Sequence, residues 1–214
     1  MKRHLPSAIA RSALALFAVA TFATAALAQS NRVVLVEEHW ELKLTTPDFE
    51  RSAPQITMVM SPAANIDGLH FLFTINHLTV PDYQPGGMQV QLWNHDELVE
   101  DSVADSSGSF EHQDETIRWV QRLWLDDGVL NFQVREGSSE TWNTFGGDDL
   151  TLHTTTQLNS LNKYRPAVSL AESQVGYAEN RVNSLTLTKL VWVTDDGEVH
   201  EQNAPIPIDT SLDN

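Results

Sequence analysis

Residues 122–137 decide the fold class, and they read Arg122-Leu-Trp-Leu-Asp-Asp-Gly-Val-Leu-Asn-Phe-Gln-Val-Arg-Glu-Gly137. After Gly128, the apolar residues Leu130, Phe132 and Val134 alternate with polar ones, which is the period of a half-buried strand. The Asp-Asp-Gly in the middle tolerates the positive φ of a type I′ turn. The stretch therefore predicts a β-hairpin.

The same two-residue period recurs along the chain. It marks four further strand segments, around residues 69–75, 88–92, 117–125 and 185–188. A second Asp-Gly turn stands at residues 195–197, and the best helical candidate, residues 150–161, is rich in threonine, which favours strands. We expect an all-β fold, a two-sheet antiparallel β-sandwich with little or no helix.

Two segments carry a resemblance to a known fold group. Residues 122–137 are similar to the paired central strands of concanavalin A-like and laminin-G-like sandwiches, and residues 175–190 resemble their closing strand. The resemblance implies two curved antiparallel sheets in a jelly-roll arrangement. It implies little about activity, because this fold hosts lectins, glycosidases, adhesion modules and structural domains.

The N-terminus resembles a secretory signal peptide. Residues 1–28 combine a basic start, an alanine-rich apolar run and the cleavage pattern Ala26-Leu-Ala28. A membrane anchor is the alternative, but the run is shorter and less apolar than a spanning helix requires. We expect cleavage after Ala28, a secreted or periplasmic protein that does not span the membrane, one sandwich domain over 29–203, and a polar tail over 204–214.

Composition excludes several classes of function. The 214 residues carry a net charge of −16 and contain no cysteine. A nucleic acid is excluded as a partner because its recognition needs positive charge. Disulfides, thiolate metal sites and thiol catalysis are excluded as well. The signal peptide would take three of the 13 basic residues and none of the acidic ones, leaving a net charge of −19.

A pair of catalytic carboxylates is the first chemistry to consider on such a sandwich. The nearest stretch is Glu37-Glu38-His39-Trp40-Glu41, which lacks a central aspartate. Glu38 shares a strand face with Val36, Trp40 and Leu42, so we expect it near a sheet edge or paired with an arginine. No nucleophile motif and no histidine motif for zinc is present, so we expect no catalytic residues.

Calcium is the one cofactor that the sequence suggests. Asp148 and Asp149 follow two glycines, whose freedom lets backbone carbonyls converge on a cation. Aspartates in turns are equally well explained by hydrogen bonds to their own backbone. The pair is therefore a candidate calcium site.

Aromatic and basic residues suggest a ligand surface. Arg118, Arg122 and Trp124 share the face of their strand opposite the expected core, where tryptophan can stack on a sugar and arginine can bind acidic groups. Trp93 and Trp142 break the alternation or lie near loops. The alternative is that Trp124 and Val120 pack under a covering loop, with the aliphatic stems of the arginines extending out to solvent.

These features together predict a secreted, non-catalytic β-sandwich protein with a binding or cell-surface structural role. The alternative is a lectin-like carbohydrate-binding protein, or a glycoside-active enzyme, on the same fold. The expected partner is a glycan or another cell-surface component.

The excess of acid leads to a test on stability. Repulsion among unneutralised carboxylates opposes folding and is screened by salt. We expect the melting temperature to rise with added sodium chloride and with divalent cations, as measured by calorimetry. A melting temperature that does not respond to either would show that the acidic charge is well dispersed.

Overall fold

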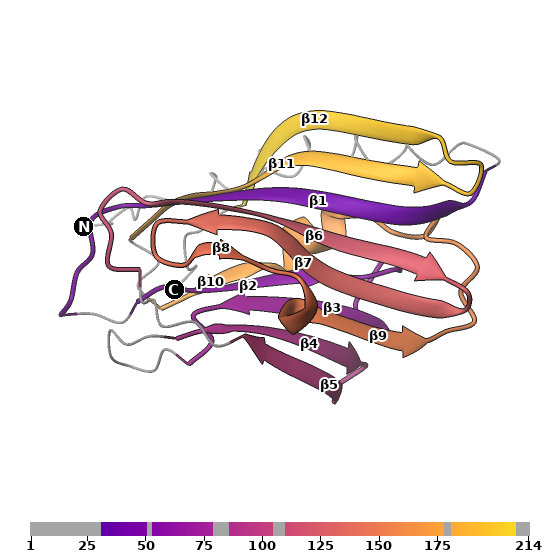
Figure 1. The fold of residues 1–214 in the computed structure, drawn as a ribbon, viewed down its shortest axis with the longest axis horizontal. Coiled ribbons are helices and arrows are strands. Elements are labelled where there is room, and N and C mark those ends of the chain that lie inside the picture. Colours follow the sequence, from indigo (N-terminus) through magenta and orange to yellow (C-terminus); the bar gives the residue numbers. More distant parts are fainter. Residues whose placement is uncertain (1–30, 51–52, 79–85, 105–109, 178–180, 209–214) are drawn as a thin grey trace, which may run out of the picture. The chain divides into compact units, whose positions relative to one another are not determined.

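Two antiparallel β-sheets form the fold in the computed structural model of the chain (Figure 1). The structure describes residues 31–50, 53–78, 86–104, 110–177 and 181–208. The expected signal peptide and cleavage site lie outside this range. The described residues form one compact unit.

The larger sheet has seven strands in the order β12-β11-β1-β6-β7-β8, and β9 also pairs with β7. Its central strand β1 lies between β11 and β6 and pairs with β6 from Leu35 to Lys43. The strands of this sheet are β1 (Val33–Leu44), β6 (Thr116–Asp126), β7 (Val129–Ser139), β8 (Asn143–Phe145), β9 (Thr151–Thr155), β11 (Val182–Thr194) and β12 (Val199–Ile208).

The smaller sheet has five strands in the order β10-β2-β3-β4-β5. These strands are β2 (Gln55–Met60), β3 (Leu69–Ile75), β4 (Met88–Asn94), β5 (Glu97–Ala104) and β10 (Gln174–Gly176). The helices among the described residues are the short 3₁₀ turn η1 (Asp148–Leu150) and α1 (Pro166–Glu172). The predicted all-β, two-sheet antiparallel sandwich is confirmed.

The hairpin that the opening stretch predicts joins β6 to β7. Asp127 and Gly128 have φ angles of 43° and 77°, so both central residues adopt the positive φ of a type I′ turn. At the second predicted turn, the amide of Thr194 donates to the carbonyl of Glu198 (3.0 Å), closing the β11–β12 hairpin.

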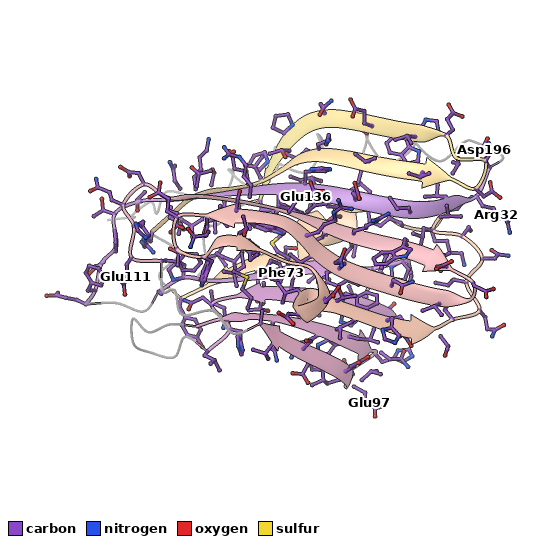
Figure 2. The ribbon with its side chains drawn as sticks, in the orientation of Figure 1. Arg32, Phe73, Glu97, Glu111, Glu136 and Asp196 are labelled. Carbon is purple, nitrogen blue, oxygen red and sulfur yellow. The ribbon has the colours of Figure 1, made fainter. Side chains whose placement is uncertain are left out.

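Aromatic side chains from both sheets meet in the core. The ring of Phe71 on β3 stacks on that of Phe132 on β7, with centroids 4.9 Å apart and planes 11° apart. Phe73 contacts Trp119 edge to face at 6.0 Å. Figure 2 shows Phe73 inside the sandwich and Glu97 pointing away from it. The alternation that predicts the strands therefore also separates core from surface.

Residues 156–173 cross from the larger sheet to the smaller one, and we call them the bridging segment. They begin after β9 and end where the Ser173 hydroxyl accepts a hydrogen bond from the amide of Val59 on β2 (2.9 Å). The amide of Leu161 donates to the carbonyl of Val33 (2.7 Å). The segment contains α1, which begins at Pro166, a residue well suited to a first helical position.

Strand β12 corrects the expected polar tail. Residues 204–208 continue this strand, and Thr186 and Leu187 of β11 pair with Pro207 and Ile206. Proline removes a backbone donor and is excluded from central strands, but an edge strand tolerates it where its missing N–H faces away from the partner. The domain therefore extends at least to Ile208, and residues 209–214 lie outside the described range.

None of the helices in the described parts of the chain is long and apolar enough to cross a membrane.

The stacked pair between the sheets gives a test of the core. Phe132 is fully buried, so Phe132→Ala removes the ring that Phe71 stacks on and leaves a cavity. We expect a loss of about 3–5 kcal/mol in the free energy of unfolding, measured by denaturant titration. Replacing exposed Val103 by alanine is the control and should change this free energy by less than about 0.5 kcal/mol.

Candidate functional site

The predicted ligand patch lies on the outer face of β6, and its two arginines are already paired with glutamates. Arg118 Nη2 is 2.6 Å from Glu41 Oε2, and Arg122 Nε is 3.5 Å from Glu37 Oε1. This follows from the register, because Glu41 lies opposite Arg118 and Glu37 opposite Arg122 on the neighbouring strand β1. The arginines therefore form a cross-strand ladder with carboxylates.

Trp124, the third predicted residue, is covered by its neighbour. The guanidinium carbon of Arg122 lies 5.0 Å from the centre of the Trp124 ring, a cation–π distance. Leu35 on β1 lies opposite Trp124 on the other side. The structure thus brings Arg118, Arg122 and Trp124 to one face, as the alternation predicts, but it pairs them with one another and with β1.

The predicted calcium pair, Asp148 and Asp149, forms η1 between β8 and β9. Across the described ranges, no three His, Asp or Glu side chains are grouped so that they could hold a metal ion. Calcium at this pair stays a prediction from sequence. Ser102 on β5 donates its hydroxyl to the carbonyl of Asp149 (2.8 Å), so η1 is attached to the smaller sheet.

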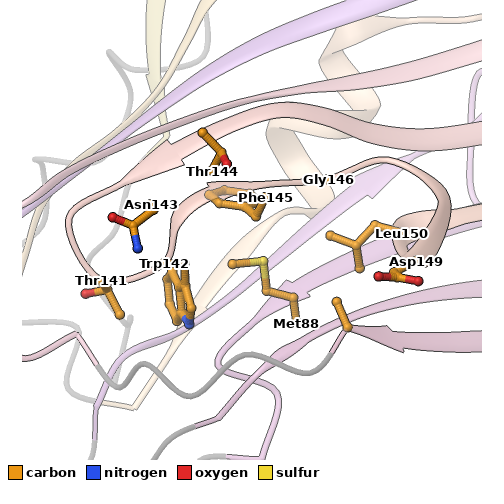
Figure 3. Close-up of a pocket in the computed structure, with 10 residues that line it drawn as sticks. Met88, Thr141, Trp142, Asn143, Thr144, Phe145, Gly146, Asp149 and Leu150 are labelled. Atoms are coloured by element: carbon orange, nitrogen blue, oxygen red, sulfur yellow. The ribbon is translucent and has the colours of Figure 1, made fainter.

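Asp149 also lines a cavity of about 350 Å³ beside η1 (Figure 3). Met88, Trp142 and Leu150 supply apolar surface, and Asn143 and Asp149 lie at opposite ends. Trp142 is held because Phe110 packs against it edge to face, with ring centroids 4.7 Å apart. The lining combines these apolar side chains with the polar side chains of Thr141 and Thr144.

A second cavity, of about 480 Å³, lies at one end of the smaller sheet and is built around Trp93. A register shift between Leu92 and Trp93 interrupts the β4–β5 ladder here. The Trp93 side chain lies on the outer face, half-buried, with His70 of β3 directly opposite. The remaining lining residues are Ile66, Asp67, Leu72, His95 and Asp96.

Two separate turns form this cavity, and the carbonyl oxygen of Gly68 joins them. Gly68, at the end of the β2–β3 loop, accepts from the amide of His95 in the β4–β5 turn (3.3 Å) and lies 3.0 Å from Nδ1 of His70. Asp67 and Asp96, the neighbours of Gly68 and His95, therefore reach the same cavity from different turns. We call the seven lining residues the Trp93 site.

Comparisons with protein-family models, curated proteins and solved structures gave no match.

The outer face beside the Trp93 site carries polar side chains held in place by one another. The indole Nε1 of Trp93 donates to Oε1 of Gln91 (3.4 Å), and Nε2 of Gln89 donates to Oδ2 of Asp101 (3.0 Å). Amides and carboxylates fixed in this way offer preorganised donors and acceptors to a ligand. The aromatic ring therefore stands at the end of a polar row.

Sequence reasoning found part of this site. Trp93 stands out because it breaks the alternation, but His70 and Asp96 carry no local signal of function. The turns Asn65-Ile-Asp67-Gly68 and Asn94-His95-Asp96-Glu97 flank strands that are neighbours in the sheet. The two turns could have been predicted to lie together only if the strand order had been known.

Glu38 lies neither at a sheet edge nor beside an arginine, so that expectation was wrong. It is fully buried in the middle of the larger sheet, on the inner face of β1. The hydroxyl of Tyr164 donates to its Oε1 (2.5 Å), and Nε1 of Trp40 donates to its Oε2 (3.0 Å). The bridging segment thus supplies the partner that an arginine was expected to supply.

Burial raises the pKa of Glu38 from its ordinary 4.5 to about 7, although the hydrogen bonds from Tyr164 and Trp40 act in the opposite direction. The Ser169 hydroxyl also lies close enough to lower this pKa, but its geometry falls short of a hydrogen bond. Glycoside hydrolysis uses two carboxyl groups beside the substrate. Glu38 is covered by the bridging segment and receives its hydrogen bonds from a phenol and an indole.

The pH dependence of stability tests this description of Glu38. A carboxyl group whose pKa is raised by folding makes its full contribution to stability at pH values below its pKa in the unfolded chain. It loses this contribution as the pH rises through its pKa in the folded protein. Between pH 4.5 and about 7, Glu38 should therefore lower the free energy of unfolding, by about 3 kcal/mol. Denaturant titrations across this range measure the slope.

The variant Glu38→Gln removes the titrating group, so its unfolding free energy should fall less steeply with pH than that of the wild type. Glu97→Gln, on an exposed position of β5, is the matched control and should retain the wild-type slope. Equal slopes for Glu38→Gln and the wild type would contradict the burial of an ionisable carboxyl at this position.

Proposed function

We propose that this chain is an exported, non-catalytic carbohydrate-binding protein that holds a glycan on the outer face of its smaller sheet. The observation that carries the proposal is the half-buried Trp93 ring in a cavity of about 480 Å³, between carboxylates and imidazoles. An aromatic ring in a shallow site can stack on the apolar face of a sugar, while side-chain oxygens and nitrogens bind its hydroxyls.

The shape and position of the site support a chain of sugars over a single buried ligand. The polar row of Gln91 and Gln89 continues from Trp93 along β4, with Asp101 beside it on β5. Extended strands place same-face side chains at intervals of two residues, roughly 6.5–7 Å apart, so successive sugar units can meet successive side chains. The resemblance to sandwiches that include lectins agrees with this proposal.

The Trp93 site supports this function better than the other polar features of the molecule. On the larger sheet, Arg118 and Arg122 are paired with glutamates, and Arg122 covers the ring of Trp124. Glu38 is enclosed between β1 and the bridging segment. That the protein is exported is inferred from the signal-peptide pattern of residues 1–28.

A glycan array tests the proposal, with the wild-type protein compared with Trp93→Ala. We expect the wild type to bind at least one class of oligosaccharide, and Trp93→Ala to bind it at least about tenfold more weakly, because the stacking surface is lost. Titration calorimetry with the best array ligand then measures the affinity.

Trp124→Ala is the matched control, because it removes the same side chain from the outer face of the other sheet. It should bind the array ligand as the wild type does. Loss of binding in Trp124→Ala with retention in Trp93→Ala would move the site to the larger sheet. An array without any bound glycan would overturn the proposal.

A further inference from the structure

The chemistry of the Trp93 site restricts the kind of sugar that it can accept. His70 is 8% exposed and lines the cavity. Its Nδ1 lies 3.0 Å from the carbonyl oxygen of Gly68, which can only accept, so Nδ1 carries the proton. In the neutral ring Nε2 is then an acceptor, and no hydrogen bond links it to another residue of the described chain.

The two carboxylates of the site add further acceptors. Asp67 and Asp96 are both exposed at the rim. Asp67 Oδ2 accepts from Nδ2 of Asn65 (2.7 Å), which orients this carboxylate and leaves its second oxygen for a ligand. No lysine or arginine is among the described residues that line the cavity. The charge of these carboxylates is therefore available to a ligand.

The indole ring has the same electrostatic preference. The face of an indole is negative and attracts cations, more strongly than the face of any other side chain. A ligand for this site must therefore supply hydrogen-bond donors, and a positive charge would interact favourably with the ring and both carboxylates. A metal ion fits less well, because the described residues form no group of three metal-binding side chains.

We infer that the Trp93 site selects an amino sugar in its protonated form, an inference that rests on the proposed carbohydrate-binding function. The ammonium group binds Asp67 and Asp96, a ring hydroxyl donates to Nε2 of His70, and the apolar face of the sugar stacks on Trp93. Sugars that carry carboxylates or sulfates are repelled by the same groups. The net charge of −16 acts in the same direction at long range.

The test compares two short β-1,4-linked oligomers of equal length, one of glucosamine and one of glucose, which differ only in the amine or hydroxyl at carbon 2. Titration calorimetry at neutral pH measures both affinities. We expect the glucosamine oligomer to bind at least about tenfold more tightly, since hydrogen bonds between charged partners are stronger than neutral ones. The double variant Asp67→Asn, Asp96→Asn should bring the two affinities within about twofold of each other.

The matched control is the double variant Asp126→Asn, Asp127→Asn, which removes the same charge from the exposed β6–β7 turn. It should keep the wild-type preference for glucosamine. If it loses that preference to the same extent, the amine is attracted by net charge alone and the inference fails. A glucose oligomer that binds the wild type as tightly as glucosamine also overturns the inference, while leaving carbohydrate binding intact.

Failure of both oligomers to bind the wild type overturns the selection for amino sugars, and the glycan array then decides the proposed function separately.

Discussion

The hydrogen bond from Tyr164 to the buried carboxyl of Glu38 is the interaction on which the arrangement of the sandwich depends. A seven-stranded sheet facing a five-stranded one leaves inner-face surface that the smaller sheet does not cover. The bridging segment contacts that surface, and a carboxyl placed there needs hydrogen-bonded partners to offset the loss of water. Covering the inner face of the sheet and satisfying the buried carboxyl of Glu38 are therefore achieved by the same contact.

With the inner face closed, the two outer faces carry the exposed polar side chains, and they differ in their polar chemistry. On the larger sheet, the register places carboxylates of β1 opposite the arginines of β6, so charges are matched within the molecule. On the smaller sheet, the Trp93 site combines two carboxylates with an imidazole acceptor and has no lysine or arginine in its described lining. Unsatisfied polar groups of one kind beside an aromatic ring are what a binding surface requires, whereas matched charges mainly stabilise a fold.

Local pattern was sufficient to predict the strands but insufficient for contacts between distant residues. The alternation around Phe71 and Phe132, and the Asp-Gly turn between β6 and β7, depend on neighbouring residues and are confirmed. Glu38 was recognisable as unusual, but its partner follows 126 positions later, in a segment too short to show a helical period. The expected tail was wrong because proline excludes only central strands. Trp93 stands out in the sequence. Its partners in the site do not, because they come from two turns that only the folded chain joins, through the carbonyl of Gly68.

Two of the free edges, β12 of the larger sheet and β5 of the smaller one, have a consequence for molecules that meet one another in solution. Edge strand β12 carries Pro205 and Pro207, which cannot donate backbone hydrogen bonds to a further strand. Edge strand β5 carries Glu97, Glu100 and Asp101, so two copies approaching along it would bring like charges together. Edge β12 therefore lacks donors for a further strand at these positions, and edge β5 repels a second copy. A protein rich in β-structure and free of disulfides can in this way remain dispersed at concentrations where unprotected sheets would join into aggregates.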